Sequence, residues 1–83
     1  MYKVKVHILL KDDVLDPQGK TVSNALENLG FIGVSNMRIG KFIEFTSTES
    51  DEKRLSKNVK EMCEKVLANT VIEKYDFSLE RIQ

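Results

Sequence analysis

The chain has 83 residues, of which 41% are hydrophobic and 31% charged, and its 13 basic and 13 acidic residues leave a net charge of zero. A chain of this length predicts a single domain over residues 1–83 with a modest core, so self-association is expected. The charge balance argues against a nucleic-acid binder, which needs a basic face. No apolar run approaches the roughly 20 residues of a membrane span, and no signal-peptide pattern is seen, which predicts a cytoplasmic protein with no membrane partner.

The first predicted elements are a strand and a helix. Residues 2–10 alternate apolar and polar side chains, as a half-buried strand does. A helix is predicted over residues 17–29, because Asp16 is a suitable N-cap and Pro17 suits the first helical position. Its apolar stripe consists of Val22, Ala25, Leu26 and Leu29. We therefore expect Leu26→Ala to remove a core side chain and to cost about 2–5 kcal/mol.

Gly19 is not explained by the helix signals. A glycine in the first turn costs roughly 1 kcal/mol relative to alanine. Such a residue usually has a backbone reason, for example the close approach of another surface. The junction between the first strand and the first helix is therefore where we look for function.

Two further strands are predicted on either side of Gly40, over residues 34–39 and 41–47. They form a hairpin in this interpretation. A three-residue loop that pairs Ile39 with Ile43 is favoured, because this register gives one continuous apolar face.

A second helix over about residues 51–68 and a last strand over residues 74–80 complete the pattern. The order strand-helix-strand-strand-helix-strand predicts an α+β, ferredoxin-like βαββαβ fold. Each helix has one apolar face, so both helices are expected to cover the same side of an antiparallel sheet. The other side of the sheet is then mixed in charge, and Arg38 faces Glu44 on it. Its remaining residues are Lys3, Lys5, His7, Leu9, Lys74 and Asp76.

The residue pattern contains no recognisable catalytic constellation. His7, the only histidine, lies between lysines on the first strand and is interpreted as a sheet-face residue, not as a ligand or base. Cys63, the only cysteine, lies on the apolar stripe of the second helix and is interpreted as a buried structural thiol. Asp12, Asp13 and Asp16 lack EF-hand spacing and a histidine partner, so no metal site is expected.

Four stretches together resemble one family. They read VKVHILLK at 4–11, VLDPQG at 14–19, MRIGKFIEF at 37–45 and EMCEKVLANTVIEKYDF at 61–77. In this order and over nearly the whole chain, the sequence resembles PurS, the small subunit of bacterial and archaeal formylglycinamidine ribonucleotide synthase. One departure is Phe42, where the family often has tyrosine and therefore one more hydroxyl.

The resemblance implies a ferredoxin-like subunit that forms dimers or tetramers and joins a glutaminase subunit, PurQ, and a large ATP-using synthetase subunit, PurL. That complex converts formylglycinamide ribonucleotide, glutamine and ATP to formylglycinamidine ribonucleotide in purine biosynthesis. The small subunit is expected to bridge the two large ones and to support ammonia transfer between their active sites. It is expected to hold no cofactor and no catalytic residue, with ATP and magnesium bound only by the large synthetase subunit.

The resemblance also implies partner contacts. Carried over residue by residue, they fall on Asp16, Gln18 and Gly19 of the DPQG motif and on Arg38 and Lys41 of the RxGK motif. Three residues of the two motifs also have a structural interpretation that does not involve a partner. Asp16 is also a helix cap, Gly40 also suits a hairpin turn, and Arg38 is also placed to pair with Glu44 across the strands.

Two other functions remain open at this point. An unrelated module similar to ACT domains, which bind amino acids between paired sheets, has the same architecture, so architecture does not decide between them. An RNA binder similar to RRM domains is a weaker alternative. It lacks the expected exposed aromatic residues on the first strand, where Lys3, Lys5 and His7 stand.

Overall fold

The computed structural model describes residues 1–82. Three antiparallel strands form one sheet in the order β2-β1-β3. Along the chain the elements are β1 (Tyr2–Leu10), α1 (Pro17–Asn28), β2 (Lys41–Ser47), α2 (Glu52–Met62), the π-helical segment η1 (Cys63–Leu67) and β3 (Glu73–Arg81). The predicted α+β class, with an antiparallel sheet and two helices, is confirmed. The predicted bounds of the first strand and of the strand over residues 41–47 are also confirmed.

β1 is the middle strand, and its alternation is the basis of the core. Val4, Val6 and Ile8 point to one face of the sheet and are at most 1% exposed. In the observed register Val6 lies opposite Ile43 of β2 and Phe77 of β3. Apolar residues on three adjacent strands therefore meet on one face, the inner face, as the period of two requires.

Helix α2 covers this inner face. Leu55, Val59 and Cys63 follow one another at intervals of four and are fully buried against the sheet. Asp51 caps the helix, because its carboxylate accepts a hydrogen bond from the backbone N–H of Lys53 at 3.0 Å. Burial raises the pKa of the Cys63 thiol. The prediction that Cys63 is a buried structural thiol is confirmed.

The predicted hairpin around Gly40 is wrong. Residues 34–39 form no strand, and the chain enters β2 through Gly40 without a turn. Asn36 interrupts the extended run with a φ of 58°. Gly40 serves a close approach instead, because a Cβ there would overlap the carbonyl oxygen of Ile8. The glycine is therefore needed where the chain passes β1, and Ile39 does not pair with Ile43.

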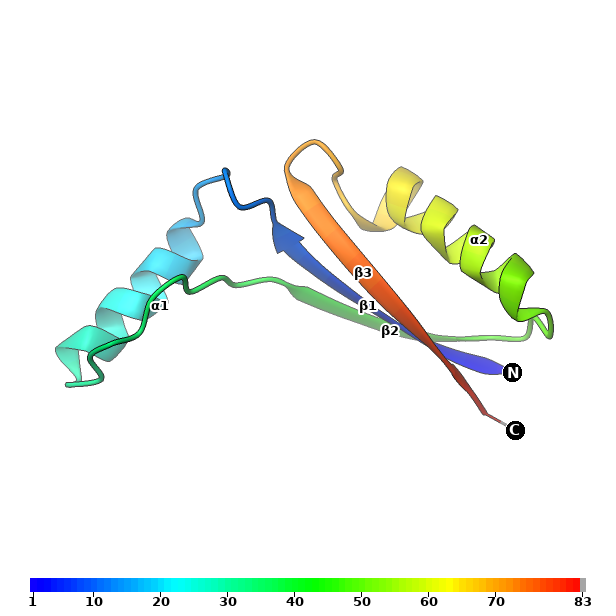
Figure 1. Ribbon diagram of the computed structural model, residues 1–83, viewed down its shortest axis with the longest axis horizontal. Coiled ribbons are helices and arrows are strands. Elements are labelled where there is room, and N and C mark those ends of the chain that lie inside the picture. The colour runs from blue at the N-terminus through cyan, green and yellow to red at the C-terminus, as the bar shows by residue number, and fades with distance from the viewer. Residues whose placement is uncertain (83) are drawn as a thin grey trace.

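Helix α1 lies beyond the end of the sheet instead of covering it (Figure 1). The radius of gyration is 16.3 Å, against about 12 Å for a compact domain of this length. Leu26 is only half-buried and Leu29 is 74% exposed. The expected pair of helices on one face is therefore not seen in the single chain, and the cost predicted for Leu26→Ala does not apply to it. Within residues 1–82, neither helix has the length and apolar character needed to cross a membrane.

The outer face of the sheet is polar. Its cross-strand ion pairs include Lys3–Glu44 at 2.9 Å and Lys5–Glu80 at 3.5 Å, and His7 Nδ1 lies 3.4 Å from Asp76 Oδ1. The His7 ring lies 4.8 Å from the Phe42 ring between centroids, so the prediction of a sheet-face histidine is confirmed. The predicted Arg38–Glu44 pair is wrong, because β2 begins only at Lys41 and Glu44 pairs with Lys3.

A pair of leucine substitutions tests the position of the core. Leu55→Ala is expected to lower the free energy of unfolding by about 2–5 kcal/mol, because it leaves a cavity under α2. Leu15→Ala is the matched control, since the Leu15 side chain is exposed, and it should change stability by less than about 0.5 kcal/mol. Chemical denaturation measures both values. Equal effects would contradict the placement of the core under α2.

Candidate functional site

The two motifs singled out in the sequence meet at the junction, which we define as residues 12–19 and 37–41. Asp16 joins its two halves. One carboxylate oxygen, Oδ1, accepts a hydrogen bond from Gly19 N at 2.9 Å, and the other, Oδ2, accepts from Ile39 N at 2.9 Å. Asp16 is 7% exposed. One buried carboxylate therefore caps α1, as predicted, and also binds the chain segment that returns from it.

The junction favours the charged form of Asp16. The hydrogen bonds from Gly19 and Ile39, and the nearby charge of Arg38, hold the pKa of this carboxyl below its ordinary value of 3.8. Backbone N–H groups that donate to a carboxylate stabilise its ionised form. Asp16 is therefore a structural anion and is not suited to serve as a general acid near neutral pH.

Gly19 is buried against the returning segment. A Cβ at this position would overlap the carbonyl oxygen of Met37. This contact explains why a glycine is tolerated in the first turn of a helix, and the prediction that another surface approaches closely is confirmed. The surface belongs to the same chain.

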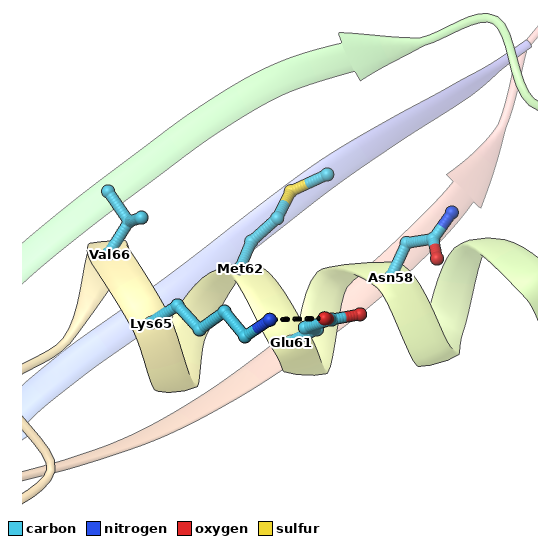
Figure 2. Close-up of a pocket in the computed structure, with 5 residues that line it drawn as sticks. All are labelled: Asn58, Glu61, Met62, Lys65 and Val66. Atoms are coloured by element: carbon cyan, nitrogen blue, oxygen red, sulfur yellow. Dashed lines mark hydrogen bonds and ion pairs between the residues drawn. The ribbon is translucent and has the colours of Figure 1, made fainter.

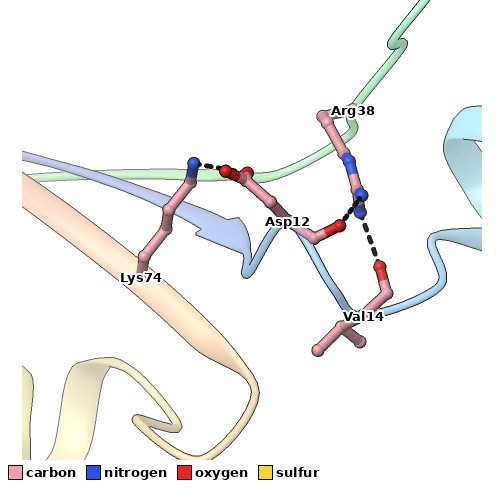
Figure 3. Close-up of polar contacts among 4 residues, drawn as sticks. All are labelled: Asp12, Val14, Arg38 and Lys74. Carbon is pink, nitrogen blue, oxygen red and sulfur yellow. Dashed lines mark hydrogen bonds and ion pairs between the residues drawn. The ribbon is translucent and has the colours of Figure 1, made fainter.

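Arg38 ties the returning segment to the loop before α1. Its guanidinium donates to Val14 O at 2.7 Å and to Asp12 O at 2.9 Å. On the other side of the loop, Lys74 of β3 binds Asp12 Oδ1 at 2.8 Å (Figure 3). The Lys74 ammonium holds the pKa of Asp12 below its usual range. Arg38 thus has a role in the chain itself, and Asp12 is engaged by a lysine.

Lys41 and Gln18 are the exposed members of the predicted set. Lys41 Nζ lies 3.3 Å from Glu73 Oε2, and the Lys41 side chain is 63% exposed while that of Glu73 is 11% exposed. The pKa of Glu73 is lowered mainly by a hydrogen bond from the backbone N–H of Asn69. The neighbouring Lys41 ammonium lowers it further. A hollow of about 250 Å³ is lined by Leu10, Asp16, Pro17, Gln18, Ile39, Gly40, Lys41 and Glu73. An amide and an ammonium group are therefore presented at the rim of one hollow.

Glu73 and the backbone of Ile39 were not predicted as parts of this site. Glu73 is 32 positions beyond Lys41, and only the pairing of both outer strands with β1 brings the two together. The opposite charges of Lys41 and Glu73 were the only feature of the sequence that indicated this contact. The Ile39 N–H could not be assigned to Asp16 while residues 34–39 were predicted as a paired strand.

A family model described as PurS, phosphoribosylformylglycinamidine (FGAM) synthase, matches residues 3–81. The chain belongs to the PurS family. It is 52% identical to the phosphoribosylformylglycinamidine synthase subunit PurS of Bacillus subtilis, over 99% of this chain and 96% of the relative. It is also similar to the crystal structure of Methanocaldococcus jannaschii PurS, with a TM-score of 0.88, 42% identity and full coverage of both chains.

A chain of the PurLQS structure from Thermotoga maritima is a further PurS-like neighbour. Its TM-score is 0.86 at 27% identity, and the match covers 94% of this chain and 95% of that chain.

A substitution at Gly19 tests the close approach of the two halves of the junction. Gly19→Ala should destabilise the chain by about 1–3 kcal/mol, because the new methyl group displaces the Met37 backbone. Helix propensity alone predicts the opposite sign, a gain of about 1 kcal/mol. Lys20→Ala, one position further on the exposed side of α1, is the control and should be nearly neutral. A stabilised Gly19→Ala variant would show that the Met37 backbone does not lie against position 19.

The lowered pKa of Asp16 predicts a pH dependence. The unfolded chain binds this proton at a higher pH than the folded chain, so Asp16 stabilises the fold fully above about pH 4 and loses this effect as the pH falls through its lower folded pKa. Asp16→Asn should lower the melting temperature at pH 7, and its difference from wild type should shrink towards pH 2. Thermal melts of both proteins across this range measure the difference. A difference that does not vary with pH would contradict an ionised Asp16.

Proposed function

We propose that this chain is the bridging subunit of a phosphoribosylformylglycinamidine synthase complex in purine biosynthesis. Its membership of the PurS family carries the proposal. The Bacillus subtilis relative is named as a subunit of that synthase, and a similar chain is part of the Thermotoga maritima PurLQS assembly. In this function the chain supports ammonia transfer from a PurQ-type glutaminase to a PurL-type synthetase. The ACT-like alternative is not favoured, because the family match covers nearly the whole chain.

In this proposal the chain supplies surfaces and no catalytic residue. The ligase chemistry belongs to the complex, with ATP and magnesium on the large synthetase subunit, and the chain itself binds no cofactor. It works in the cytoplasm and associates with itself as a dimer or tetramer. Its zero net charge does little to oppose such association.

The junction is the proposed partner site. Gln18 and Lys41 contact a large subunit directly, because both are exposed at the rim of the same hollow. Asp16, Gly19 and Arg38 contribute to the same contact by fixing the shape of the backbone around it.

Reconstitution tests the bridging function. Purified synthetase and glutaminase are assayed for formylglycinamidine ribonucleotide with and without this chain, using either glutamine or free ammonium as the nitrogen source. We expect glutamine-driven synthesis to require the chain and ammonium-driven synthesis to proceed without it. Equal rates from glutamine in both mixtures would refute the proposal.

Variants of the two exposed residues test the partner site. Gln18→Ala and Lys41→Ala should each weaken assembly about tenfold, which corresponds to about 1.4 kcal/mol, and should leave the melting temperature nearly unchanged. Lys57→Ala, an exposed lysine on α2, is the matched control and should assemble normally. The affinity is measured by titrating each variant into the two large subunits. Normal assembly of both junction variants would exclude these side chains as contacts.

A further inference from the structure

The carboxylate of Glu73 contacts one of the two exposed residues of the proposed partner site and has no role in that site so far. Glu73 is the first residue of β3, and its side chain is only 11% exposed. An ionised carboxylate with so little access to water needs hydrogen-bond or ion-pair partners, because its desolvation is otherwise uncompensated. Each of its two oxygens has such a partner.

One oxygen holds the loop between η1 and β3. Glu73 Oε1 accepts a hydrogen bond from the backbone N–H of Asn69 at 2.7 Å, and the Glu73 N–H donates to the Asn69 carbonyl oxygen at 2.7 Å. The Asn69 side chain closes the same loop, because its Oδ1 accepts from Val71 N at 3.2 Å. A connected network of this kind rigidifies its members. The direction of the Glu73 side chain is therefore fixed by the loop beside it.

The other oxygen, Oε2, lies 3.3 Å from the ammonium nitrogen of Lys41. Lys41 is paired with Ile8 of β1. Glu73 is paired with Leu10, two positions further along the same strand. Both charged side chains therefore lie on the inner face, where they line the hollow of about 250 Å³ beside the junction.

The surface pair between Glu61 and Lys65 shows what is special about this contact. Glu61 Oε1 and Lys65 Nζ lie 2.6 Å apart, and these side chains are 55% and 70% exposed (Figure 2). A pair that is exposed on both sides fixes neither partner, because two long side chains must be ordered for a weak attraction. In the Lys41–Glu73 pair the carboxylate is already fixed, and only the ammonium is largely exposed. The carboxylate therefore sets where the ammonium is presented.

We propose that Glu73 is a positioning residue, which holds the Lys41 ammonium at the rim of the hollow for contact with a large subunit. This inference rests on the partner site in the proposed function. A lysine ammonium has three donors, so one can bind Glu73 while the others remain for the partner. Ordering a long side chain before binding avoids an entropic cost that corresponds to about two- to tenfold in affinity.

The charges that line the hollow indicate which partner group Lys41 meets. They are the carboxylates of Asp16 and Glu73 and the ammonium of Lys41. Hydrogen bonds from backbone N–H groups hold the pKa of both carboxyls below the ordinary value, which keeps them ionised. A carboxylate of the large subunit would therefore meet two negative charges and one positive charge. The hollow instead suits a neutral acceptor, such as a backbone carbonyl or a side-chain amide, which an ammonium binds strongly.

A double-mutant cycle over Lys41 and Glu73 tests the positioning role. Glu73→Gln keeps an oxygen that can accept from Asn69 N and removes the charge that attracts Lys41. We expect it to weaken assembly about fivefold, measured by titration into the two large subunits. In the Lys41→Ala background the same change should have no further effect, because the side chain that it positions is absent. Glu61→Gln removes the carboxylate of the exposed pair and is the control that should assemble normally.

A second measurement needs no variant. Nuclear magnetic resonance relaxation of the Cε methylene groups in the free wild-type chain should show Lys41 more restricted than Lys65. Equal mobility of the two lysines would overturn the positioning role. So would normal assembly of Glu73→Gln or of Lys41→Ala. An equal loss from Glu73→Gln in both backgrounds would show that Glu73 acts through the fold. Stronger assembly of Glu73→Gln would show that Glu73 competes with a partner carboxylate for Lys41.

Failure of this inference and failure of the proposed function give different results. If Glu73→Gln assembles normally while glutamine-driven synthesis requires the chain, the positioning role fails and the proposed function stands. If the cycle gives the expected coupling and glutamine-driven synthesis is nevertheless independent of the chain, the proposed function fails. Glu73 then still positions Lys41 for assembly.

Discussion

The carboxylate of Asp16 is the interaction on which the rest of this structure depends. It is the one buried charged group of the described residues, and its two oxygens bind the first turn of α1 and the backbone of Ile39. Because a buried carboxylate must keep its hydrogen bonds, the start of the helix and the returning segment cannot separate. The glycine at position 19 and the guanidinium of Arg38 then close the same junction from either side.

This constraint connects the two motifs with the shape of the molecule. Residues more than 20 positions apart form one rigid junction, and Gln18 and Lys41 are presented together at its rim. The same contacts hold α1 beyond the end of the sheet (Figure 1), so the inner face is covered by α2. The partner contact proposed for Gln18 and Lys41 would thus depend on a carboxylate that is itself nearly inaccessible.

The sequence by itself determined the local elements and part of the site. The period of two predicted β1 and β2 with their observed bounds, and the period near 3.6 together with Asp16 and Pro17 predicted α1. These features depend on neighbouring residues only, so a linear pattern contains them. The conformational cost of Gly19 also revealed that another surface approaches there, although nothing in the pattern identified that surface as Met37.

The tertiary structure alone decided where α1 lies and whether residues 34–39 pair. An apolar stripe favours a helix with one buried side, but it does not show against which element that side packs. Alternation over 34–39 is equally compatible with a hairpin and with an unpaired segment. The structure selected the second, because Asn36 breaks the extended run and Ile39 donates to Asp16. The Lys41–Glu73 pair likewise required the strand order β2-β1-β3, which no local signal specifies.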